Sequence, residues 1–322
     1  MSATRGYLVT GGAGFVGASL CHRLLRDGHR VLCVDNLSTG SALQMAPYRS
    51  HPRFTLVQHD VTEPLPPRAV PSEIEGIFHL ACPASPRWYQ AQPIETTRTA
   101  VLGTLNMLDL AHRRGIPMLQ ASTSEVYGSP LRHPQREEDW GQVNPIGPRA
   151  CYDEGKRCAE SLCADYRRDF GVDVRIARIF NTYGPGMRAD DGRVVSNFIL
   201  QALRGEPITV DGDGQQTRSL CFVDDLVEGL VRLLDVSGEV TLPVNLGNPE
   251  ECSVHQLAML VLDITGSAVP IRLRPRPEDD PQRRCPDISR ARELLGWQPQ
   301  VDLHTGLAWT VDAFREAGVR RA

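Results

Sequence analysis

A glycine-rich turn between an apolar strand and a helix is the feature that most restricts how this chain can fold. The apolar residues 7–10 run directly into Gly11, Gly14 and Gly17, and an amphipathic helix is expected over Phe15–Arg26. Glycine has no Cβ, so the backbone can turn tightly and a phosphate can approach it closely. The free N–H groups at the start of the helix favour an anion. The pattern therefore predicts a strand and helix that bind a dinucleotide.

Strand-like and helix-like segments alternate through the first half of the chain. Buried strands are predicted at 31–34, 54–57, 77–81, 118–121 and 174–180, with helices at 94–114 and 152–170. This alternation predicts an α/β fold with a Rossmann-type doubly wound parallel sheet. After about residue 184, glycine and proline are frequent and only short helices are expected, at 194–204, 224–234, 253–264 and 303–315. We predict a dinucleotide-binding domain over residues 1–183, to which later segments return, and a smaller, interleaved substrate-binding region over residues 184–322.

An acidic residue at the end of the second predicted strand indicates which dinucleotide binds. Asp35 stands 18 residues after Gly17. A carboxylate there can hold both ribose hydroxyls of NAD and repels the 2′-phosphate of NADP, so we expect NAD as the cofactor. Asp60 follows the third predicted strand, where an adenine contact and a turn-capping role fit it equally well.

Tyr152 and Lys156 are the strongest candidates for catalytic residues. They lie four residues apart at the start of a predicted helix, so their side chains share one face. Lys156 is the only lysine among 35 basic residues, and an ammonium beside a phenol lowers the pKa of that phenol. Tyr152 can then take the proton of an alcohol while its carbon gives a hydride to NAD⁺.

A second group of polar residues follows the strand predicted at 118–121. Parallel sheets place their chemistry at the carboxyl ends of the strands. Thr123 can hydrogen-bond the hydroxyl that Tyr152 deprotonates, and Glu125 offers a carboxylate near the next carbon. A serine nucleophile is disfavoured because the chain has no Gly-x-Ser-x-Gly elbow at this point.

Composition excludes several other classes of function. The net charge is −4, and no basic run exceeds a pair, so a nucleic-acid partner is not expected. The chain is 41% hydrophobic and has no apolar run of transmembrane length, so no membrane association is expected. The nine cysteines show no Cys-x-x-Cys pair and no zinc-like spacing with histidine, which predicts no metal site and a reduced, cytoplasmic location. The chain begins on a strand pattern, so no signal peptide is expected.

Together these motifs resemble the extended short-chain dehydrogenase/reductase family and, more narrowly, the UDP-glucuronate decarboxylases. The resemblance covers nearly the whole chain and is most discriminating in Cys151-Tyr-Asp-Glu-Gly-Lys-Arg157. The other strings that carry it are His79-Leu-Ala-Cys-Pro-Ala-Ser85, Gly103-Thr-Leu-Asn-Met-Leu108, Ala121-Ser-Thr-Ser-Glu-Val-Tyr-Gly128, Asn144-Pro-Ile-Gly-Pro-Arg-Ala150, Phe180-Asn-Thr-Tyr-Gly-Pro185, Asp191-Gly-Arg-Val-Val-Ser-Asn-Phe198, Gln216-Thr-Arg218 and Asp279-Asp-Pro-Gln-Arg-Arg284.

The resemblance implies NAD-dependent decarboxylation of UDP-glucuronate to UDP-xylose. Tyr152 takes the 4-hydroxyl proton as the C4 hydride goes to NAD⁺, CO₂ leaves the resulting β-keto acid, and bound NADH reduces the ketone again. Glu125 is essential by the same resemblance, and three roles stay open for it: handling a proton at C5, orienting a water, or fixing the ring. Arg284 matches an arginine near the sugar carboxylate.

Three alternatives stay open. In the first, the enzyme releases the UDP-4-keto-pentose together with NADH. In the second, it is a related nucleotide-sugar 4-epimerase or 4,6-dehydratase, and Ser124 disfavours the dehydratase because such enzymes carry an acid at that position. In the third, the chain is an NAD-binding sensor or scaffold, which the presence of both Tyr152 and Lys156 disfavours.

The resemblance also assigns residues to the two ligands. The cofactor residues are Gly11, Gly14, Phe15, Val16, Gly17, Asp35, Asn36, Ser38, Thr39, Gly40, Asp60, Val61, Leu80, Ala81, Pro83, Thr99, Ala121, Tyr152, Lys156, Thr182 and Arg188. The substrate residues are Ala84, Ser85, Tyr89, Asn181, Arg193, Val195, Thr209, Gln216, Arg218 and Arg284. The catalytic residues are Thr123, Glu125, Tyr152, Lys156 and Arg284.

The resemblance further implies a homodimer, formed through helices around 103–111 and 158–166. Three positions depart from the family pattern. Ala100 stands where an asparagine is usual, and Cys82 replaces a common serine near the nicotinamide. Asp211 replaces a common tyrosine near the uracil.

Overall fold

The computed structural model describes residues 4–276 and 282–319, so Asp279, Asp280 and Pro281 of the 279–284 string lie outside the described residues. Within the described part, a seven-stranded parallel sheet forms the centre, in the order β11-β6-β5-β4-β1-β2-β3. Its strands are β1 (Gly6–Thr10), β2 (Arg30–Asp35), β3 (Phe54–Gln58), β4 (Ile74–His79), β5 (Met118–Thr123), β6 (Val174–Ile179) and β11 (Val244–Leu246). This order confirms the predicted α/β fold with a doubly wound sheet.

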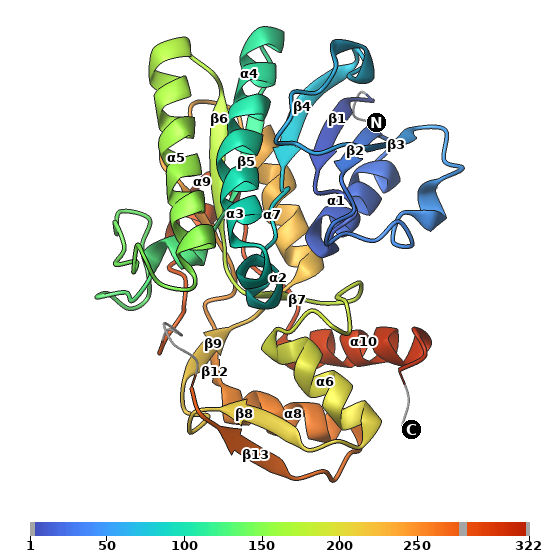
Figure 1. Ribbon diagram of the computed structural model, residues 1–322, viewed down its shortest axis with the longest axis vertical. Coiled ribbons are helices and arrows are strands. Elements are labelled where there is room, and N and C mark those ends of the chain that lie inside the picture. The colour runs from blue at the N-terminus through green and yellow to red at the C-terminus, as the bar shows by residue number, and fades with distance from the viewer. Residues whose placement is uncertain (1–3, 277–281, 320–322) are drawn as a thin grey trace.

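Helices cover both faces of the sheet (Figure 1). One face carries α1 (Phe15–Arg26), α7 (Val223–Asp235) and α9 (Ser289–Leu295), and the other carries α3 (Pro93–Arg98), α4 (Thr104–Arg114) and α5 (Ala150–Phe170). A π-helical stretch at Thr99–Gly103 joins α3 to α4. Successive side chains of a strand point to opposite faces, so Tyr7 and Val9 enter one core while Leu8 enters the other.

A smaller lobe lies beyond the carboxyl ends of the strands (Figure 1). Its helices are α6 (Val194–Arg204), α8 (Val254–Thr265) and α10 (Leu303–Glu316), which share a separate core. Its strand pairs are β7 (Thr182–Tyr183) with β10 (Cys221–Phe222), β8 (Ile208–Asp211) with β13 (Ile271–Arg274), and β9 (Thr217–Ser219) with β12 (Glu251–Ser253). These strands have two to four residues each, too few to show an alternating pattern in the sequence, and they were not predicted.

The chain crosses between the two lobes several times after residue 183. Helix α7, strand β11 and helix α9 all return to the sheet, and β11 extends it beside β6. Trp297, which follows α9, is buried and donates from Nε1 to the Asp225 carbonyl of α7 at 2.8 Å. The division of the chain into domains at residue 183 stays a prediction.

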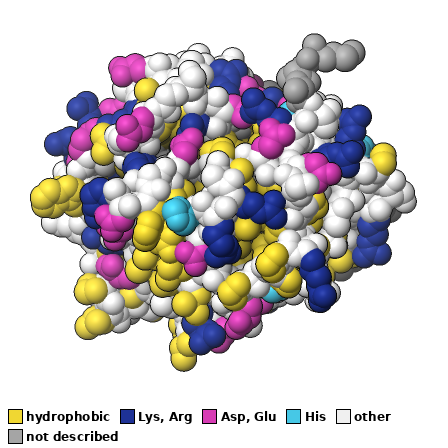
Figure 2. Space-filling view, turned by 90° about the horizontal axis from the view of Figure 1, so that it is seen from above, with side chains coloured by type: hydrophobic (Ala, Val, Ile, Leu, Met, Phe, Trp, Pro, Cys, Tyr) yellow, Lys and Arg dark blue, Asp and Glu magenta, His cyan; other side chains and the backbone are white. Residues whose placement is uncertain are grey.

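Most strand boundaries differ from the sequence prediction by one to three residues, and two of the differences concern predicted site residues. Strand β3 ends at Gln58, so Asp60 stands two residues beyond it, and β4 ends at His79 rather than Ala81. The remaining short helix of this region, α2 (Pro86–Ala91), follows β4 after a six-residue loop. None of the described helices is long and apolar enough to cross a membrane. On the face seen in Figure 2, basic and acidic side chains are interspersed rather than gathered by sign.

A buried ion pair joins α5 to the neighbouring strands β5 and β6 of the sheet. Arg178 on β6 donates to both carboxylate oxygens of Glu160, at 2.9 and 2.7 Å. It also donates to the Tyr127 hydroxyl and to the Glu137 carbonyl, each at 3.0 Å. Ser122 on β5 donates to the same Glu160 carboxylate at 2.6 Å. Because this contact is buried, removing one partner leaves a charge that water cannot reach.

We expect Arg178→Met to lower the free energy of unfolding by about 3–5 kcal/mol, because Glu160 loses its buried cation. The matched control is Arg168→Met on α5, whose side chain is 69% exposed and pairs with Asp165 at the surface. That change should cost less than about 1 kcal/mol. Urea unfolding of both variants measures the difference, and equal losses of stability would contradict the structural role of Arg178.

Candidate active site

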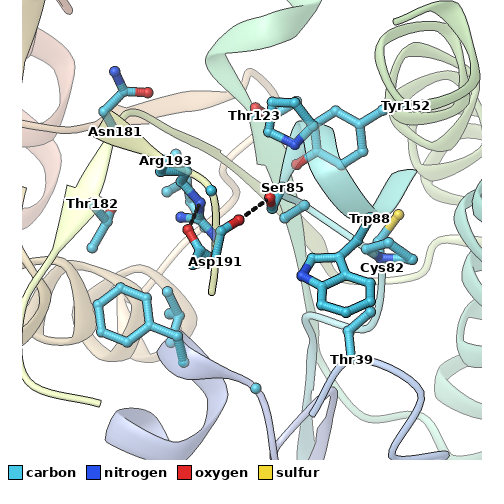
Figure 3. Close-up of a pocket in the computed structure, with 18 of the residues that line it drawn as sticks. Thr39, Cys82, Ser85, Trp88, Thr123, Tyr152, Asn181, Thr182, Asp191 and Arg193 are labelled. Atoms are coloured by element: carbon cyan, nitrogen blue, oxygen red, sulfur yellow. Dashed lines mark hydrogen bonds and ion pairs between the residues drawn. The ribbon is translucent and has the colours of Figure 1, made fainter. Parts of the chain in front are cut away.

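A cavity of about 510 Å³ lies between the sheet and the smaller lobe. The carboxyl ends of β1, β2, β4, β5 and β6, with the loops that follow them, form one wall, and α6, β8 and β9 contribute to the other. Figure 3 shows Thr123 and Tyr152 across this space from Asn181 and Thr182. The position agrees with the rule that open α/β sheets bind ligands beyond the carboxyl ends of their strands.

The glycine-rich turn at one end of the cavity fits a dinucleotide. Gly14 donates its N–H to the Gly11 carbonyl at 3.1 Å and is the residue before α1. A Cβ on Gly17 would lie 2.1 Å from the Gly11 oxygen, so only glycine allows this close packing of helix on turn. The turn thus leaves backbone and helix N–H groups open to a diphosphate, as NAD binding requires.

Asp35 closes this end of the cavity. Its carboxylate accepts hydrogen bonds from the Ala13 N–H at 2.9 Å and the Leu37 N–H at 2.8 Å. Burial raises the pKa of Asp35, and these two backbone donors oppose that rise. The side chain is therefore held in place at the end of β2, where ribose hydroxyls can donate to it.

Tyr152 and Lys156 reach the cavity from the start of α5, and Thr123 reaches it from the end of β5. Lys156 donates from Nζ to the Ala121 carbonyl at 2.7 Å, and the same nitrogen lies 5.9 Å from the centroid of the Tyr152 ring. The Tyr89 ring stacks parallel to the Tyr152 ring, with centroids 5.0 Å apart. These contacts fix the phenol and the ammonium relative to β5.

The expected lowering of the Tyr152 pKa by Lys156 is wrong, because the pKa of this phenol is raised. Burial is the main cause that raises the pKa of Tyr152, and the nearby Cys82 adds to the rise. A hydrogen bond with the Thr123 side chain acts in the opposite direction. The Lys156 ammonium points to the Ala121 carbonyl, so its effect on the phenol is too weak to offset the loss of hydration.

Glu125 lies between two guanidinium groups. Arg284 donates from Nη1 to Oε1 at 2.6 Å and from Nη2 to Oε2 at 2.7 Å. Arg149 donates from Nη2 to Oε2, also at 2.7 Å. Burial favours the neutral acid, but the charges of Arg284 and Arg149 outweigh it and hold the pKa of Glu125 below its usual range. Glu125 is therefore an ionised hydrogen-bond acceptor at neutral pH.

A second set of polar side chains lies around the middle of the cavity. Ser85 donates from Oγ to the Asp191 carbonyl at 2.5 Å, and the Asp191 carboxylate pairs with Nε of Arg193 at 2.9 Å (Figure 3). Asn181 Oδ1 lies 3.5 Å from Nη1 of Arg284. Polar groups from the loop after β4 and from the segment before α6 thus meet at the middle of the cavity.

Residues of the smaller lobe line the end of the cavity that lies away from the sheet, which we call the far arm. Arg274 on β13 donates from Nε to the Asp211 carboxylate on β8 at 3.0 Å. Gln216 donates from Nε2 to the Asp211 carbonyl at 2.6 Å. Arg218 is 8% exposed and donates from Nη1 to the Thr217 carbonyl at 2.8 Å. This arm is suited to an anionic and polar group, as a nucleoside diphosphate is.

The structure brings nearly all predicted site residues to this one cavity. Among the described residues, every predicted catalytic, cofactor and substrate residue lines it except Gly40, Asp60 and Tyr89. A Cβ on Gly40 would lie 3.0 Å from the Asp35 oxygens, so Gly40 stands behind that carboxylate. Asp60 accepts from Asn36 Nδ2 at 2.9 Å and is directed to a turn, and Tyr89 is 1% exposed beside Tyr152. The individual roles of the lining residues stay predictions.

Sequence reasoning missed several residues of the cavity wall. The most important is Arg149, which lay unassigned within the 144–150 string although it supplies half of the positive charge on Glu125. Trp88, Asp191 and Arg274 also line the cavity. The sequence held one indication of these residues, because Asp191 stands two positions before Arg193, which was assigned to the substrate. The pairing of Arg274 with Asp211 depends on the alignment of β8 with β13, which no local pattern shows.

One group of side chains outside this cavity has the composition of a metal site. In the part of the chain that the structure describes, ligand atoms of His133, Glu251 and Cys285 lie within 4.8 Å of one another. His133 Nε2 and a Glu251 carboxylate oxygen lie 2.8 Å apart, so these two side chains already pair. The three residues come from distant segments, so their spacing in the sequence could not indicate the group.

Comparison with known proteins agrees with this geometry. Residues 7–247 match the model of the NAD-dependent epimerase/dehydratase family. UDP-glucuronic acid decarboxylase 2 of Arabidopsis thaliana is 56% identical over 96% of this chain and 68% of its own length. UDP-glucuronic acid decarboxylase 1 of Xenopus tropicalis is 55% identical over 96% of this chain and 72% of its own length.

A solved structure has a similar fold. The UDP-glucuronic acid 4-epimerase of Bacillus cereus, in complex with UDP-glucuronic acid and NAD, is similar with a TM-score of 0.86 and 27% identity, over 97% of this chain and 99% of that one. The family match covers most of the chain, and the decarboxylases match nearly all of it. The chain therefore belongs to the NAD-dependent epimerase/dehydratase family and, within it, to the UDP-glucuronic acid decarboxylases.

Proposed function

We propose that this enzyme converts UDP-glucuronate to UDP-xylose and CO₂ with NAD as a recycled cofactor. The observation that carries the proposal is the single cavity wall that holds both the Tyr152, Lys156 and Thr123 group and the Glu125 carboxylate between its two arginines. The first group suits oxidation of an alcohol, and the second suits a sugar with a carboxylate. The similarity to decarboxylases over 96% of the chain supports the same reaction.

The first step is oxidation at C4 of the sugar. Tyr152 takes the proton of the 4-hydroxyl group, and Thr123 holds the same oxygen by a hydrogen bond. NAD, which the turn at Gly11–Gly17 and Asp35 would hold, would supply the redox chemistry as the acceptor and later the donor of the C4 hydride. Lys156 is anchored on the Ala121 carbonyl beside the phenol, where its positive charge favours the phenolate over the neutral phenol.

Loss of CO₂ follows because a ketone at C4 lies β to the C5 carboxylate. The negative charge then moves to the C4 oxygen, which Tyr152 and Thr123 can stabilise by hydrogen bonds. Arg284 bonds to Glu125 through both of its terminal nitrogens, so Glu125 already neutralises part of the charge that the substrate carboxylate would meet. The substrate carboxylate is therefore held without tight neutralisation, which favours its departure as CO₂.

The charge of Glu125 restricts its role. The two arginines hold its pKa low, so it has no proton to give to C5 at neutral pH. Of the three roles left open by the sequence, an ionised carboxylate suits two: accepting a hydrogen bond from a ring hydroxyl, or orienting a water that protonates C5.

The test of the proposed function is product analysis by NMR after incubation with UDP-glucuronate and NAD⁺. We expect UDP-xylose and CO₂, and we expect Tyr152→Phe to lower turnover roughly a thousandfold, because it removes the proton acceptor. The matched control is Tyr166→Phe on the same helix, whose hydroxyl donates to Asp109 away from the cavity. Consumption of substrate without CO₂ would contradict the proposal, and release of a 4-keto sugar with NADH would support the shorter reaction.

Glu125→Gln separates binding from chemistry. The amide cannot balance the two guanidinium groups, so we expect tighter binding of UDP-glucuronate and a roughly hundredfold fall in kcat, because the uncompensated charge resists loss of the carboxylate as CO₂. Binding of UDP-glucose, which has no carboxylate, serves as the control and should change much less. Parallel losses of affinity for both ligands would argue that Glu125 acts by fixing the fold of the site.

We also propose that the enzyme works as a homodimer in a reducing compartment such as the cytoplasm. All nine cysteines are unpaired, which supports the second part. Helices α4 and α5 lie side by side over one face of the sheet, with Cys158 exposed on α5 and Leu102 exposed just before α4 (Figure 1). Two such pairs can bury these surfaces against each other as a four-helix contact.

Light scattering tests the dimer. We expect a mass of twice the 35.6 kDa of the chain, and we expect Leu102→Arg to shift the population toward monomer because it places a charge in the apolar contact. Leu131→Arg is the control, since that side chain is also exposed but belongs to the loop between β5 and α5. A monomeric mass for the unchanged protein would overturn the proposal.

A further inference from the structure

A second buried carboxylate lies near Glu125, and the reaction described above gives it no role. Asp153 follows Tyr152 in the first turn of α5 and is 6% exposed. Its Oδ1 atom has no hydrogen-bond partner among the described residues. An ionised carboxylate without partners loses its hydration and recovers little in return, so such a group either serves a purpose or carries a proton.

Charged groups from several segments act on Asp153. Glu125 comes from the turn after β5, Arg149 from the residue before α5, Arg284 from the segment before α9, and Glu154 from α5 itself. Burial and the Glu125 charge raise the pKa of Asp153 to about 7, and the two arginines oppose that rise. Asp153 therefore changes its charge near neutral pH, while Glu125 stays ionised.

The charged side chains on the other elements packed against the start of α5 have partners of their own, and Arg87 on α2 donates to the Asp190 carbonyl at 2.9 Å. Tyr89 on α2 contributes a buried hydroxyl, which also has no hydrogen-bond partner in the described part of the chain. Burial raises the pKa of Tyr89, so it stays neutral. Helix α3 carries Glu95 and Arg98, which are 64% and 51% exposed and lie 3.8 Å apart as a surface pair. The π-helical stretch 99–103 has no charged residue.

The charge balance of the cluster depends on Asp153. Arg149 and Arg284 carry two positive charges and Glu125 one negative charge, so these three residues together are positive by one unit. A protonated Asp153 leaves that positive charge in place, and an ionised Asp153 cancels it. Because the cluster is buried, the difference is only weakly screened by solvent.

We propose that Asp153 is a positioning residue that sets the charge which the cluster of Glu125, Arg149 and Arg284 presents to the carboxylate of the substrate. The protonated form makes the cluster positive and draws the carboxylate in. The ionised form makes the cluster neutral and weakens its hold on the carboxylate. The inference rests on the proposed function in one respect, since it requires a sugar that carries a carboxylate.

The direction of the pH dependence follows from linkage. A bound carboxylate disfavours a second negative charge nearby, so binding raises the pKa of Asp153 above its value of about 7 in the free enzyme. Affinity is therefore full below pH 7 and falls as the pH rises through the higher pKa of the occupied enzyme. A one-unit difference between the two pKa values makes the fall roughly fivefold to tenfold between pH 6 and pH 8.5.

Calorimetry on the Tyr152→Phe enzyme, saturated with NAD⁺, tests this without turnover. UDP-glucuronate and UDP-glucose are titrated between pH 6 and pH 8.5, where neither ligand changes its own charge. We expect the affinity for UDP-glucuronate to fall with pH and the affinity for UDP-glucose to stay nearly level. Groups elsewhere in the site that titrate affect both ligands, and His79 does not contribute because burial lowers its pKa to about 3. Equal slopes for the two ligands would overturn the proposal.

Two further substitutions in the Tyr152→Phe enzyme show which residue causes the change of UDP-glucuronate affinity with pH. Asp153→Asn should bind UDP-glucuronate with an affinity that no longer depends on pH, and Glu154→Gln, which alters the adjacent and more exposed acid, should keep the slope. A slope that survives in Asp153→Asn contradicts the proposal. If Asp153→Asn does not fold, the difference in pH dependence between UDP-glucuronate and UDP-glucose binding still tests the proposal.

The outcome is independent of the test of the proposed function. If the unchanged enzyme fails to release CO₂, the proposed function is contradicted. The pH dependence of the two binding affinities does not rely on that result and still tests the role of Asp153. Slopes that do not differ contradict the role of Asp153 even if CO₂ is released.

Discussion

The pairing of Glu125 with Arg149 and Arg284 is the interaction on which the site depends. A carboxylate this deeply buried is stable in its ionised form only with cations beside it. Its two partners are 24 and 159 residues away along the chain. The pair to Arg284 can form only when the segment before α9 has folded onto the end of β5. The same contact therefore assembles the site and joins the C-terminal part of the chain to the sheet.

This arrangement separates two tasks within one cavity. The phenol and ammonium at the start of α5 are held by β5, and they serve the removal and return of a proton and a hydride. The carboxylate and its arginines are held by one another, and they serve the charged part of the sugar. A site that must first attract a carboxylate and then let it go needs a positive charge of limited size. A carboxylate between two guanidinium groups supplies such a charge, and a lone arginine does not.

Sequence reasoning predicted most of the long elements, and nearly all of the site residues that it predicted line the cavity. Helix α1 and helix α6 have the predicted bounds, because apolar residues at helical spacing and a glycine after α6 mark them locally. The short strands of the smaller lobe were missed because two to four residues are too few to show the alternation of buried and exposed side chains that marks a strand. The pKa of Tyr152 was misjudged because spacing showed that Lys156 was near, but not that the ammonium is directed to a backbone carbonyl or how deeply the phenol is buried.

The sequence by itself determined the doubly wound sheet, the dinucleotide turn at Gly11–Gly17 and the presence of Tyr152 and Lys156 on one helix face. Each of these depends on residues that are close along the chain, where backbone geometry and periodicity act directly. Only the tertiary structure decided that Arg149 shares Glu125 with Arg284 and that Asp153 is buried beside them. Burial and charge pairing depend on which distant segments meet, and the low polarity of the place where they meet makes each charge act strongly on the others.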